Sequence, residues 1–467
     1  MNKNNKIAIK SGFWYTVGDI LFRTIGFLTT PIFTRLLSKS EFGQFNNILS
    51  WSTILFFIFS LDIHSSIIRS KLDFEDDLDS YTTSSLFISF IFNLIGYIIV
   101  KLNINFFSEL FSIDKKYIDI LFLYLVFLEA YYIFITYERA KYKYKNYTIA
   151  TGIVIISVNV ISVSLVLLLQ NKLDARVYGY FIPYIIIGFI MALIIVKRKP
   201  KIKMEYIKYA LAISLPLLPH LISLNILSSS DKVMITNMIG EEENAVYSIA
   251  YLFSNILVII YTAMNKAWAP WFLDTLKYGN KKIIKTASRY YMLFFLVIII
   301  GAALVAPEII LILGGKKYLE STSVFAPLLV STIFQFGYSM YLQIEIFEKK
   351  LKIVSFATMC AAVVNIGLNF LLLRKYGYII AGYTTLIGYA VCYLIHYIKI
   401  KSMGYLDLLD SNLINYSLVA SIISIPIIIF LYKNNVIRYI LLMIYILFIV
   451  FLLIKNYKKV LKFWKNK

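Results

Sequence analysis

Apolar runs of about 20 residues recur along the whole chain, and this feature constrains its fold most strongly. A helix of that length crosses the roughly 30 Å of hydrocarbon in a bilayer, where only a helix or a closed barrel satisfies its own backbone hydrogen bonds. The runs are continuous and not alternating, so they exclude a β-barrel. With 60% hydrophobic residues, the chain is predicted to be an all-α polytopic membrane protein.

Fourteen transmembrane helices are predicted from these runs. Their expected bounds are residues 13–37, 46–68, 81–100, 117–137, 147–169, 177–196, 209–238, 245–265, 288–313, 323–346, 353–373, 379–399, 414–432 and 438–454. Lys and Arg number 32 in the termini and the even-numbered gaps, against 14 in the odd-numbered gaps. By the positive-inside rule, both termini are expected to be cytoplasmic. The net charge of +21 is therefore a topology signal, and no nucleic-acid partner is expected.

The chain resembles itself at an offset of 202 residues. TRLLSKSEFGQFN at 34–46 aligns with TNMIGEEENAVYS at 236–248, and the same offset places the first predicted helix on the seventh. Because an even number of helices separates the copies, both halves enter the membrane in the same direction, and such parallel repeats flank a central site in transporters. We expect two six-helix lobes, residues 1–202 and 203–404, followed by two extra helices and a basic cytoplasmic tail at 405–467.

The predicted helix 209–238 opens the second lobe and contains Pro216 and Pro219. Each proline removes a backbone donor, so a bend is expected there. The bend is interpreted either as a hinge whose carbonyls line a water-filled cavity or as a structural kink. His220 and Asn225 in the same helix are candidate cavity residues, with hydrogen-bonded packing as the alternative.

Ionisable side chains within the predicted spans are the strongest functional candidates. Each costs about 2.5–3.5 kcal/mol at a helix centre facing lipid, so these side chains are expected to face inward or to lie near an interface. They are Asp19, Arg23, Asp62, Glu129 and Glu345. Arg23 is expected either to present its cation to an anionic substrate or to pair with Asp19, four residues earlier on the same helix face.

Polar side chains near the ends of two predicted helices add further candidates. His64 and Arg69 accompany Asp62 near the cytoplasmic end of the second helix, either at a cavity mouth or in a boundary cluster. Asp62, Glu129 and Glu345 are also candidates for ion coupling. Asp231 and Lys232, near the external end of the seventh helix, are interpreted as an interfacial ion pair.

The sequence shows no arrangement typical of a soluble enzyme. The three histidines are scattered, so neither a metal site nor a cofactor is expected. The segment GGKKY at 314–318 lacks the spacing of a phosphate-binding loop. A transporter is therefore expected, driven by a gradient or by the fate of its substrate.

Several motifs, in their order and spacing, resemble the polysaccharide transporter family. They are TRLLSKSEFGQF, SLPLLPHLISLNILSSSDKVMI, AVYSIAYLFSNI, AWAPWF at 267–272 and GGKKYLES at 314–321. This family comprises flippases for lipid-linked O-antigen and capsular repeat units, within the multidrug/oligosaccharidyl-lipid/polysaccharide exporter superfamily. RTIGF at 23–27 is similar to the first-helix arginine motif of lipid II flippases, although Thr29 stands where that family has a second arginine.

The resemblance implies a flippase of the bacterial cytoplasmic membrane that turns over a polyprenyl-diphosphate-linked oligosaccharide by alternating access. It implies a cationic cavity that includes Arg23, and a groove for the lipid tail at the last two helices. The expected partners are the lipid-linked oligosaccharide and membrane lipids, with a polysaccharide polymerase as a further candidate. Two alternatives stay open: a multidrug cation antiporter of the same superfamily, and a membrane-embedded polysaccharide polymerase or acyltransferase.

Overall fold

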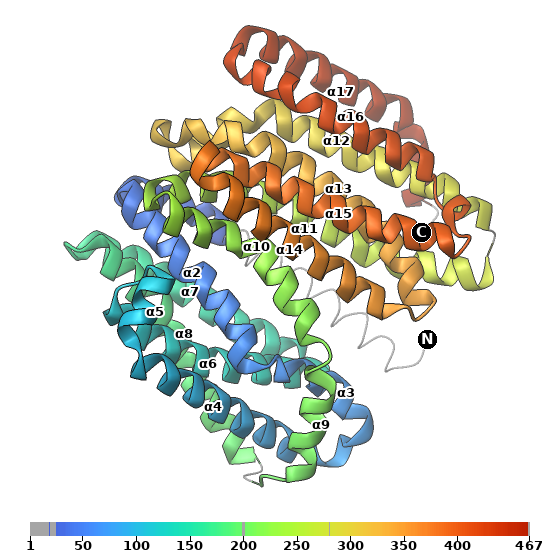
Figure 1. Ribbon diagram of the computed structural model, residues 1–467. Helices are drawn as coiled ribbons and strands as arrows, with labels where there is room; N and C mark the ends of the chain where they lie inside the picture. Colours follow the sequence, from blue (N-terminus) through green and yellow to red (C-terminus); the bar gives the residue numbers. More distant parts are fainter. Residues whose placement is uncertain (1–17, 19–24, 199–200, 280, 466–467) are drawn as a thin grey trace. The chain divides into compact units, whose positions relative to one another are not determined.

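The protein is helical throughout the part of the chain that the structure describes (Figure 1). The computed structural model describes residues 18, 25–198, 201–279 and 281–465. Among these residues, 11 helices are long and apolar enough to span a membrane, or 13 if each of two bent pairs is one span. They coincide with the predicted spans from the second onward, and the first, 13–37, lies largely outside the described residues. The all-α membrane fold is confirmed, while the number fourteen stays a prediction.

The helices form two compact units. Unit 1 contains α2 (Lys39–Ser60), η1 (Ile63–Ser65), α3 (Ser66–Asp73), η2 (Glu75–Asp77), α4 (Leu78–Leu102), α5 (Ile104–Phe111), α6 (Lys115–Ala140), α7 (Tyr144–Leu168), α8 (Lys172–Arg198), α9 (Met204–Ser214), α10 (Leu218–Met238) and nearly all of α14 (Leu351–Tyr376). Unit 2 contains α12 (Lys281–Gly314) up to Ile312, η3 (Lys316–Ser321), α13 (Thr322–Phe347), η4 (Leu406–Leu408), α16 (Ser411–Lys433) and α17 (Asn435–Lys465). Residues of α11 (Glu241–Tyr278) and α15 (Ile379–Ser402) belong to both units. The lobes expected at 1–202 and 203–404 are defined by the repeat and stay a prediction.

The two copies of the repeated segment contact each other within unit 1. α2 lies beside α10 (Figure 1), and the start of α11 meets α2 at Gly43. A Cβ atom at Gly43 would lie only 1.8 Å from the carbonyl oxygen of Glu241. The Asn244 side chain donates to the Gly43 carbonyl over 2.9 Å, and Gln44 donates to the Glu241 carboxylate over 2.5 Å. The close approach therefore needs a residue without a side chain at position 43.

Two membrane segments are sharply bent. The axes of α9 and α10 differ by 53° across residues 215–217, which confirms the bend predicted from Pro216 and Pro219. The axes of α2 and the η1–α3 segment differ by 63°, although no proline or glycine marks this break. Leu61 and Asp62 adopt left-handed φ values of 53° and 50° there. Such a conformation costs a residue with a side chain about 1–3 kcal/mol, so other contacts must hold it.

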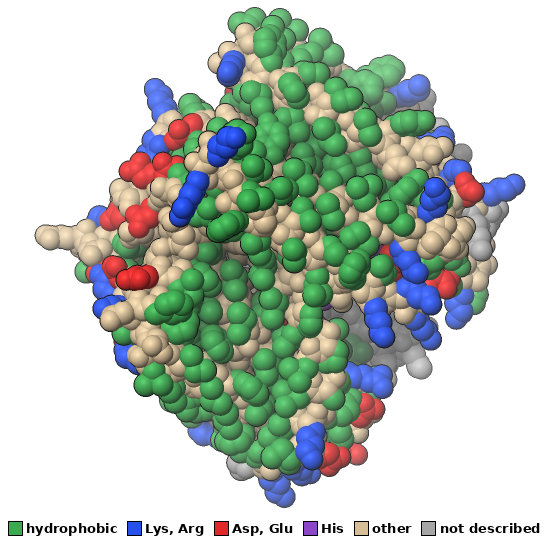
Figure 2. Space-filling model, in the orientation of Figure 1, with side chains coloured by type: hydrophobic (Ala, Val, Ile, Leu, Met, Phe, Trp, Pro, Cys, Tyr) green, Lys and Arg blue, Asp and Glu red, His purple; other side chains and the backbone are tan. Residues whose placement is uncertain are grey.

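A bidentate ion pair attaches the last helix to the rest of unit 2. Arg438 at the start of α17 is only 1% exposed, and its Nη1 and Nη2 atoms each lie 2.6 Å from the Glu308 carboxylate of α12. Nη1 also donates to the Leu304 carbonyl over 2.7 Å. Most of α17 is otherwise covered by exposed apolar side chains, and Figure 2 shows such side chains over much of the visible surface. This bidentate pair therefore gives a lipid-exposed helix a specific attachment.

Replacing Gly43 by alanine is expected to destabilise unit 1, because the new methyl group would collide with backbone that cannot rotate away. We expect a loss of about 1–3 kcal/mol, measured as a lower thermal unfolding midpoint in detergent. Gly367→Ala is the matched control, since no atom lies within 4 Å of the Cβ position in α14 and mid-helix alanine is favoured over glycine. Equal midpoints for the two variants would contradict the packing role of Gly43.

Candidate functional site

The structure brings Asp62, His64 and Glu129 together in the interior of unit 1. The backbone N–H of His64 donates to Glu129 Oε1 over 3.0 Å, and His64 Nδ1 lies 3.1 Å from Glu129 Oε2. On the other side of the ring, Nε2 lies 3.3 Å from Asp62 Oδ1. The Glu129 side chain is fully buried, and the ring of Tyr132 stacks on His64 at a centroid distance of 4.9 Å. One imidazole thus joins two carboxylates.

This cluster also explains the break between α2 and α3. Glu129 lies on α6, and its carboxylate accepts the backbone N–H of His64, two residues after the left-handed Asp62. A charge-assisted bond of this kind is stronger than one between neutral groups and offsets part of the conformational cost. Sequence analysis had placed His64 and Glu129 on separate helices with separate roles. The change of direction between α2 and α3 is what places His64 beside α6.

Chemically, the cluster can bind and release a proton at membrane depth. A protonated His64 would compensate the negative charge of one of the two carboxylates. A neutral His64 would leave the charges of both carboxylates without a cation beside them. Buried acid–histidine clusters in membrane proteins are typical of proton or cation pathways. The ion-coupling role expected of Asp62 and Glu129 stays a prediction.

A second acid–histidine pair lies inside unit 2. Glu345 on α13 and His396 on α15 are both fully buried, and His396 Nδ1 lies 2.8 Å from Glu345 Oε2. The ring of Tyr338 stacks on His396 at 5.4 Å. In the part of the chain that the structure describes, His396 Nε2 and Glu345 Oε1 have no hydrogen-bond partner. Glu345 was a predicted site residue, whereas its partner His396, 51 positions away, carried no sequence signal.

The candidates of the bent helix hold local contacts. His220 Nδ1 lies 2.9 Å from the Thr358 hydroxyl of α14, and the Asn225 side chain donates to the Leu221 carbonyl of its own helix over 2.8 Å. These are the packing contacts of the alternative interpretation, and a cavity role for either residue stays a proposal.

Asp231 corrects an expectation. Asp231 and Lys232 were predicted to form an interfacial ion pair; the interfacial position is wrong, because Asp231 is fully buried. Its carboxylate accepts hydrogen bonds from the Asn369 side chain over 2.6 Å, the Asn365 side chain over 3.1 Å and the Tyr247 hydroxyl over 2.5 Å. The hydrogen bonds link α10 to α14 and α11. The position of Asp231 near a predicted helix end had suggested that its side chain is exposed. Packing against other helices buries it instead.

The remaining predicted residues lie elsewhere. The Arg69 side chain is 62% exposed and its Nε atom lies 3.5 Å from Asp73 of the same helix, so the structure does not bring it into the buried cluster. Asp19 and Arg23 lie outside the described residues. Among the residues that are described, no group of three or more histidine, cysteine or acidic side chains could hold a metal ion.

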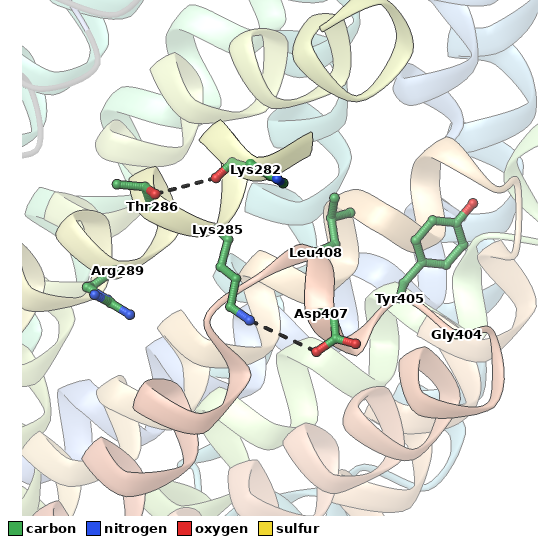
Figure 3. Close-up of a pocket in the computed structure, with 8 residues that line it drawn as sticks. All are labelled: Lys282, Lys285, Thr286, Arg289, Gly404, Tyr405, Asp407 and Leu408. Carbon is green, nitrogen blue, oxygen red and sulfur yellow. Dashed lines mark hydrogen bonds and ion pairs between the residues drawn. The ribbon is translucent and has the colours of Figure 1, made fainter. Parts of the chain in front are cut away.

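A basic pocket that sequence analysis did not single out lies at the start of α12 (Figure 3). It has a volume of about 500 Å³ and is lined by Lys282, Lys285, Thr286, Arg289, Gly404, Tyr405, Asp407 and Leu408. Figure 3 shows Lys285 reaching toward Asp407, with Nζ and Oδ1 4.0 Å apart. Arg289 Nε lies 2.6 Å from Asp410. Sequence analysis had counted these cations only as topology charges.

The rim of this pocket carries a titratable tyrosine. The Tyr405 hydroxyl donates to Glu348 Oε1 over 2.5 Å, and this hydrogen bond raises the pKa of Tyr405 above its ordinary value. The tyrosine therefore stays protonated at neutral pH. Two of the pocket cations, Lys285 and Arg289, have carboxylate neighbours.

Comparison with known proteins identifies the family. Residues 8–276 match the family described as polysaccharide biosynthesis protein, and this match spans more than half of the chain. The chain belongs to this family. A protein of the Lsg locus of Haemophilus influenzae is 21% identical over 376 residues, which cover 77% of this chain and 90% of the relative.

Solved structures show the fold. The lipid II flippase MurJ, in an inward closed conformation, matches 96% of this chain and 99% of its own length with a TM-score of 0.72 at 16% identity. An inward-facing multidrug transporter of the MATE family, also of the MOP superfamily, matches 82% of this chain and 95% of its own length with a TM-score of 0.61 at 15% identity. The chain therefore has the fold of this transporter superfamily.

Removing the Glu129 carboxylate is expected to destabilise unit 1. Glu129→Ala leaves the His64 amide and imidazole without their acceptor, and breaking a buried pair in this way costs about 3–5 kcal/mol. Glu129→Gln retains an acceptor oxygen and is expected to lose less. Thermal unfolding of the purified variants measures the effect. Glu109→Ala, on the exposed surface of α5, is the control and should change stability by no more than about 0.5 kcal/mol; a similarly small change for Glu129→Ala would refute the role of the cluster.

Proposed function

We propose that this chain is a flippase that translocates polyprenyl-diphosphate-linked oligosaccharide repeat units across the bacterial cytoplasmic membrane by alternating access. The product would enter the synthesis of a surface polysaccharide, either O-antigen or capsule. The observation that supports this most directly is the combination of membership in the polysaccharide biosynthesis family with a transporter fold. A polysaccharide polymerase that receives the translocated unit is the proposed protein partner.

The physical barrier to this reaction is desolvation. Sugar hydroxyls and a diphosphate lose their water on entering hydrocarbon, and unpaired polar groups cost several kcal/mol each. A flippase lowers this barrier by replacing water with polar and cationic side chains. The proposed cavity residues are Asp19, Arg23, Asp62, His64, Arg69, His220 and Asn225, with Pro216 and Pro219 as the hinge. Buried acid–histidine pairs at Glu129 and Glu345 are the proposed sites of ion coupling.

An apolar cavity supports the proposed lipid-tail role of the last two helices. It lies within unit 2 between α12, α13, α16 and α17 and has a volume of about 760 Å³. Its lining includes Leu296, Ile333, Ala420, Ile444 and Phe448. A polyprenyl chain is a string of branched hydrocarbon units, and a cavity whose lining is mostly apolar offers it favourable contacts. The Arg438–Glu308 pair keeps α17 at the cavity wall.

A multidrug antiporter is the second candidate function, since a MATE transporter shares the fold. That match leaves out more of this chain than the match to the lipid II flippase does, 82% against 96% coverage. Expression in a drug-sensitive host discriminates the two. We expect no gain in resistance to cationic drugs, and a clear gain would favour the antiporter.

The direct test uses the purified full chain in lipid vesicles. A polyprenyl-diphosphate-linked oligosaccharide is placed in the vesicles, and its accessibility to a membrane-impermeant glycosidase is followed over time. We expect the protein to accelerate the appearance of cleavable oligosaccharide relative to empty vesicles. Equal rates with and without protein would refute the proposal.

Arg23→Ala is expected to abolish surface polysaccharide in cells while the protein stays in the membrane. Removing one charged partner from a desolvated contact costs about 2–5 kcal/mol, enough to stop translocation at cellular concentrations. Arg23→Lys retains the charge and should keep part of the activity. Polysaccharide is measured by gel electrophoresis of surface extracts, and the protein by immunoblotting of membranes. Normal polysaccharide in the alanine variant would remove Arg23 from the cavity.

Filling the apolar cavity is expected to slow translocation without unfolding the protein. Ala420→Trp projects an indole into the space proposed for the lipid tail, and we expect the initial rate in vesicles to fall on the order of tenfold, equivalent to about 1.4 kcal/mol. Val419→Trp is the matched control, because this neighbouring side chain is 57% exposed and does not line the cavity. If both variants translocate at the same rate, the cavity does not hold the tail.

A further inference from the structure

The two arginines of α8 differ sharply in their surroundings. Arg198, at the end of the helix, lies 2.7 Å from the buried carboxylate of Glu138 through its Nη2 atom. Arg176, near the start, has aromatic neighbours instead. Its guanidinium carbon lies 3.5 Å from the ring centroid of Phe33 and 4.3 Å from that of Phe45. Both rings belong to the N-terminal part of unit 1.

Two of the three guanidinium nitrogens of Arg176 have no acceptor among the described residues. Its Nε and Nη1 atoms are enclosed by protein and have no hydrogen-bond partner, and no ion pair with another described residue reaches it. Asp174, two positions earlier, is held by Lys116 at 2.6 Å and by the Tyr117 hydroxyl at 2.5 Å. The residue as a whole is partly exposed. The guanidinium is therefore not sealed off from an approaching anion.

An apolar side chain would be cheaper at this position. A buried donor without an acceptor costs about 1–3 kcal/mol, and more when the group is charged. Stacking on aromatic rings recovers only about 0.5–2 kcal/mol. A methionine of similar length would keep the contacts with the rings and avoid the desolvated charge. Costs of this kind are tolerated where a ligand completes the hydrogen bonds.

We propose that Arg176 binds a phosphate oxyanion, namely the diphosphate group of the lipid-linked substrate, during its passage through unit 1. The planar guanidinium can donate two parallel hydrogen bonds to two oxygens of a phosphate. The rings of Phe33 and Phe45, which lie against it, hold the guanidinium in position. Arg176 lies four residues after the first residue of α8, about 6 Å along its axis. In the proposed topology this is the extracytoplasmic end, so the contact acts on the release side. The inference rests on the proposed function.

The test measures binding of geranyl diphosphate to the purified full chain in a neutral detergent by isothermal titration calorimetry. Arg176→Met is expected to weaken binding about 10- to 100-fold, the equivalent of losing charged hydrogen bonds. Its thermal unfolding midpoint should be unchanged or higher, because the unpaired charge is gone. Arg198→Met is the matched control, because it removes the arginine that pairs with the Glu138 carboxylate. This variant should have a lower thermal unfolding midpoint and an unchanged affinity for geranyl diphosphate. Arg176→Gln tests the same loss of charge with a polar side chain.

Wild-type affinity in Arg176→Met or Arg176→Gln would overturn the proposal, as would a fall in stability of either variant without a change in affinity. Two further ligands identify the source of the phosphate. Inorganic diphosphate should bind more weakly than geranyl diphosphate, and phosphatidylglycerol nanodiscs should bind wild type and variants alike. An equal dependence of phosphatidylglycerol binding on Arg176 would reassign the site to a lipid headgroup and refute the substrate contact.

The outcome is separable from that of the proposed function. If wild-type protein moves no lipid-linked oligosaccharide but binds geranyl diphosphate through Arg176, only the proposed translocation fails. If the protein translocates and Arg176→Met retains full affinity and rate, only the Arg176 contact fails.

Discussion

A charge inside a bilayer has to be neutralised by the protein itself, because hydrocarbon supplies neither water nor counterions. Three carboxylates in the described part of this chain meet the requirement through pairs that join distant segments. Glu129 meets His64, Glu345 meets His396, and Glu308 meets Arg438. Each partner alone would be a liability of several kcal/mol, and together they become specific links between helices. These pairs therefore help to determine which helices pack against each other within each unit.

Hydropathy, together with the free-energy cost of exposing a charge to lipid, predicted a large part of the helix positions and of the buried carboxylates. The helices α4, α6, α7 and α8 lie where the apolar runs placed them, and the two prolines predicted the bend between α9 and α10. The energetic cost of exposing a carboxylate to lipid predicted that Glu129 and Glu345 face inward or lie near an interface, and both are fully buried. These predictions depend only on local sequence and on the properties of the bilayer, which explains their success.

Partners and conformations could not be predicted in the same way. Nothing in the sequence near His396 indicates that it contacts Glu345. The left-handed backbone at residues 61 and 62 could not be predicted either, because no glycine or proline lies there. Arg176 lies just outside its predicted span and Arg438 at the first position of another, where a charge costs little by hydropathy alone. Asp231 was assigned to an interface for the same reason, although helix packing buries it. In each case the deciding contact comes from a segment far away in sequence.

The two sharp bends of unit 1 differ in what maintains them. The bend at residues 215–217 accompanies Pro216 and Pro219, whose missing N–H groups and rings are part of the covalent structure. At residues 61 and 62 no proline or glycine interrupts the helix, and the His64 amide donates to the side chain of Glu129. The first bend is therefore encoded locally in the chain, whereas the second depends on a contact with a residue 65 positions away.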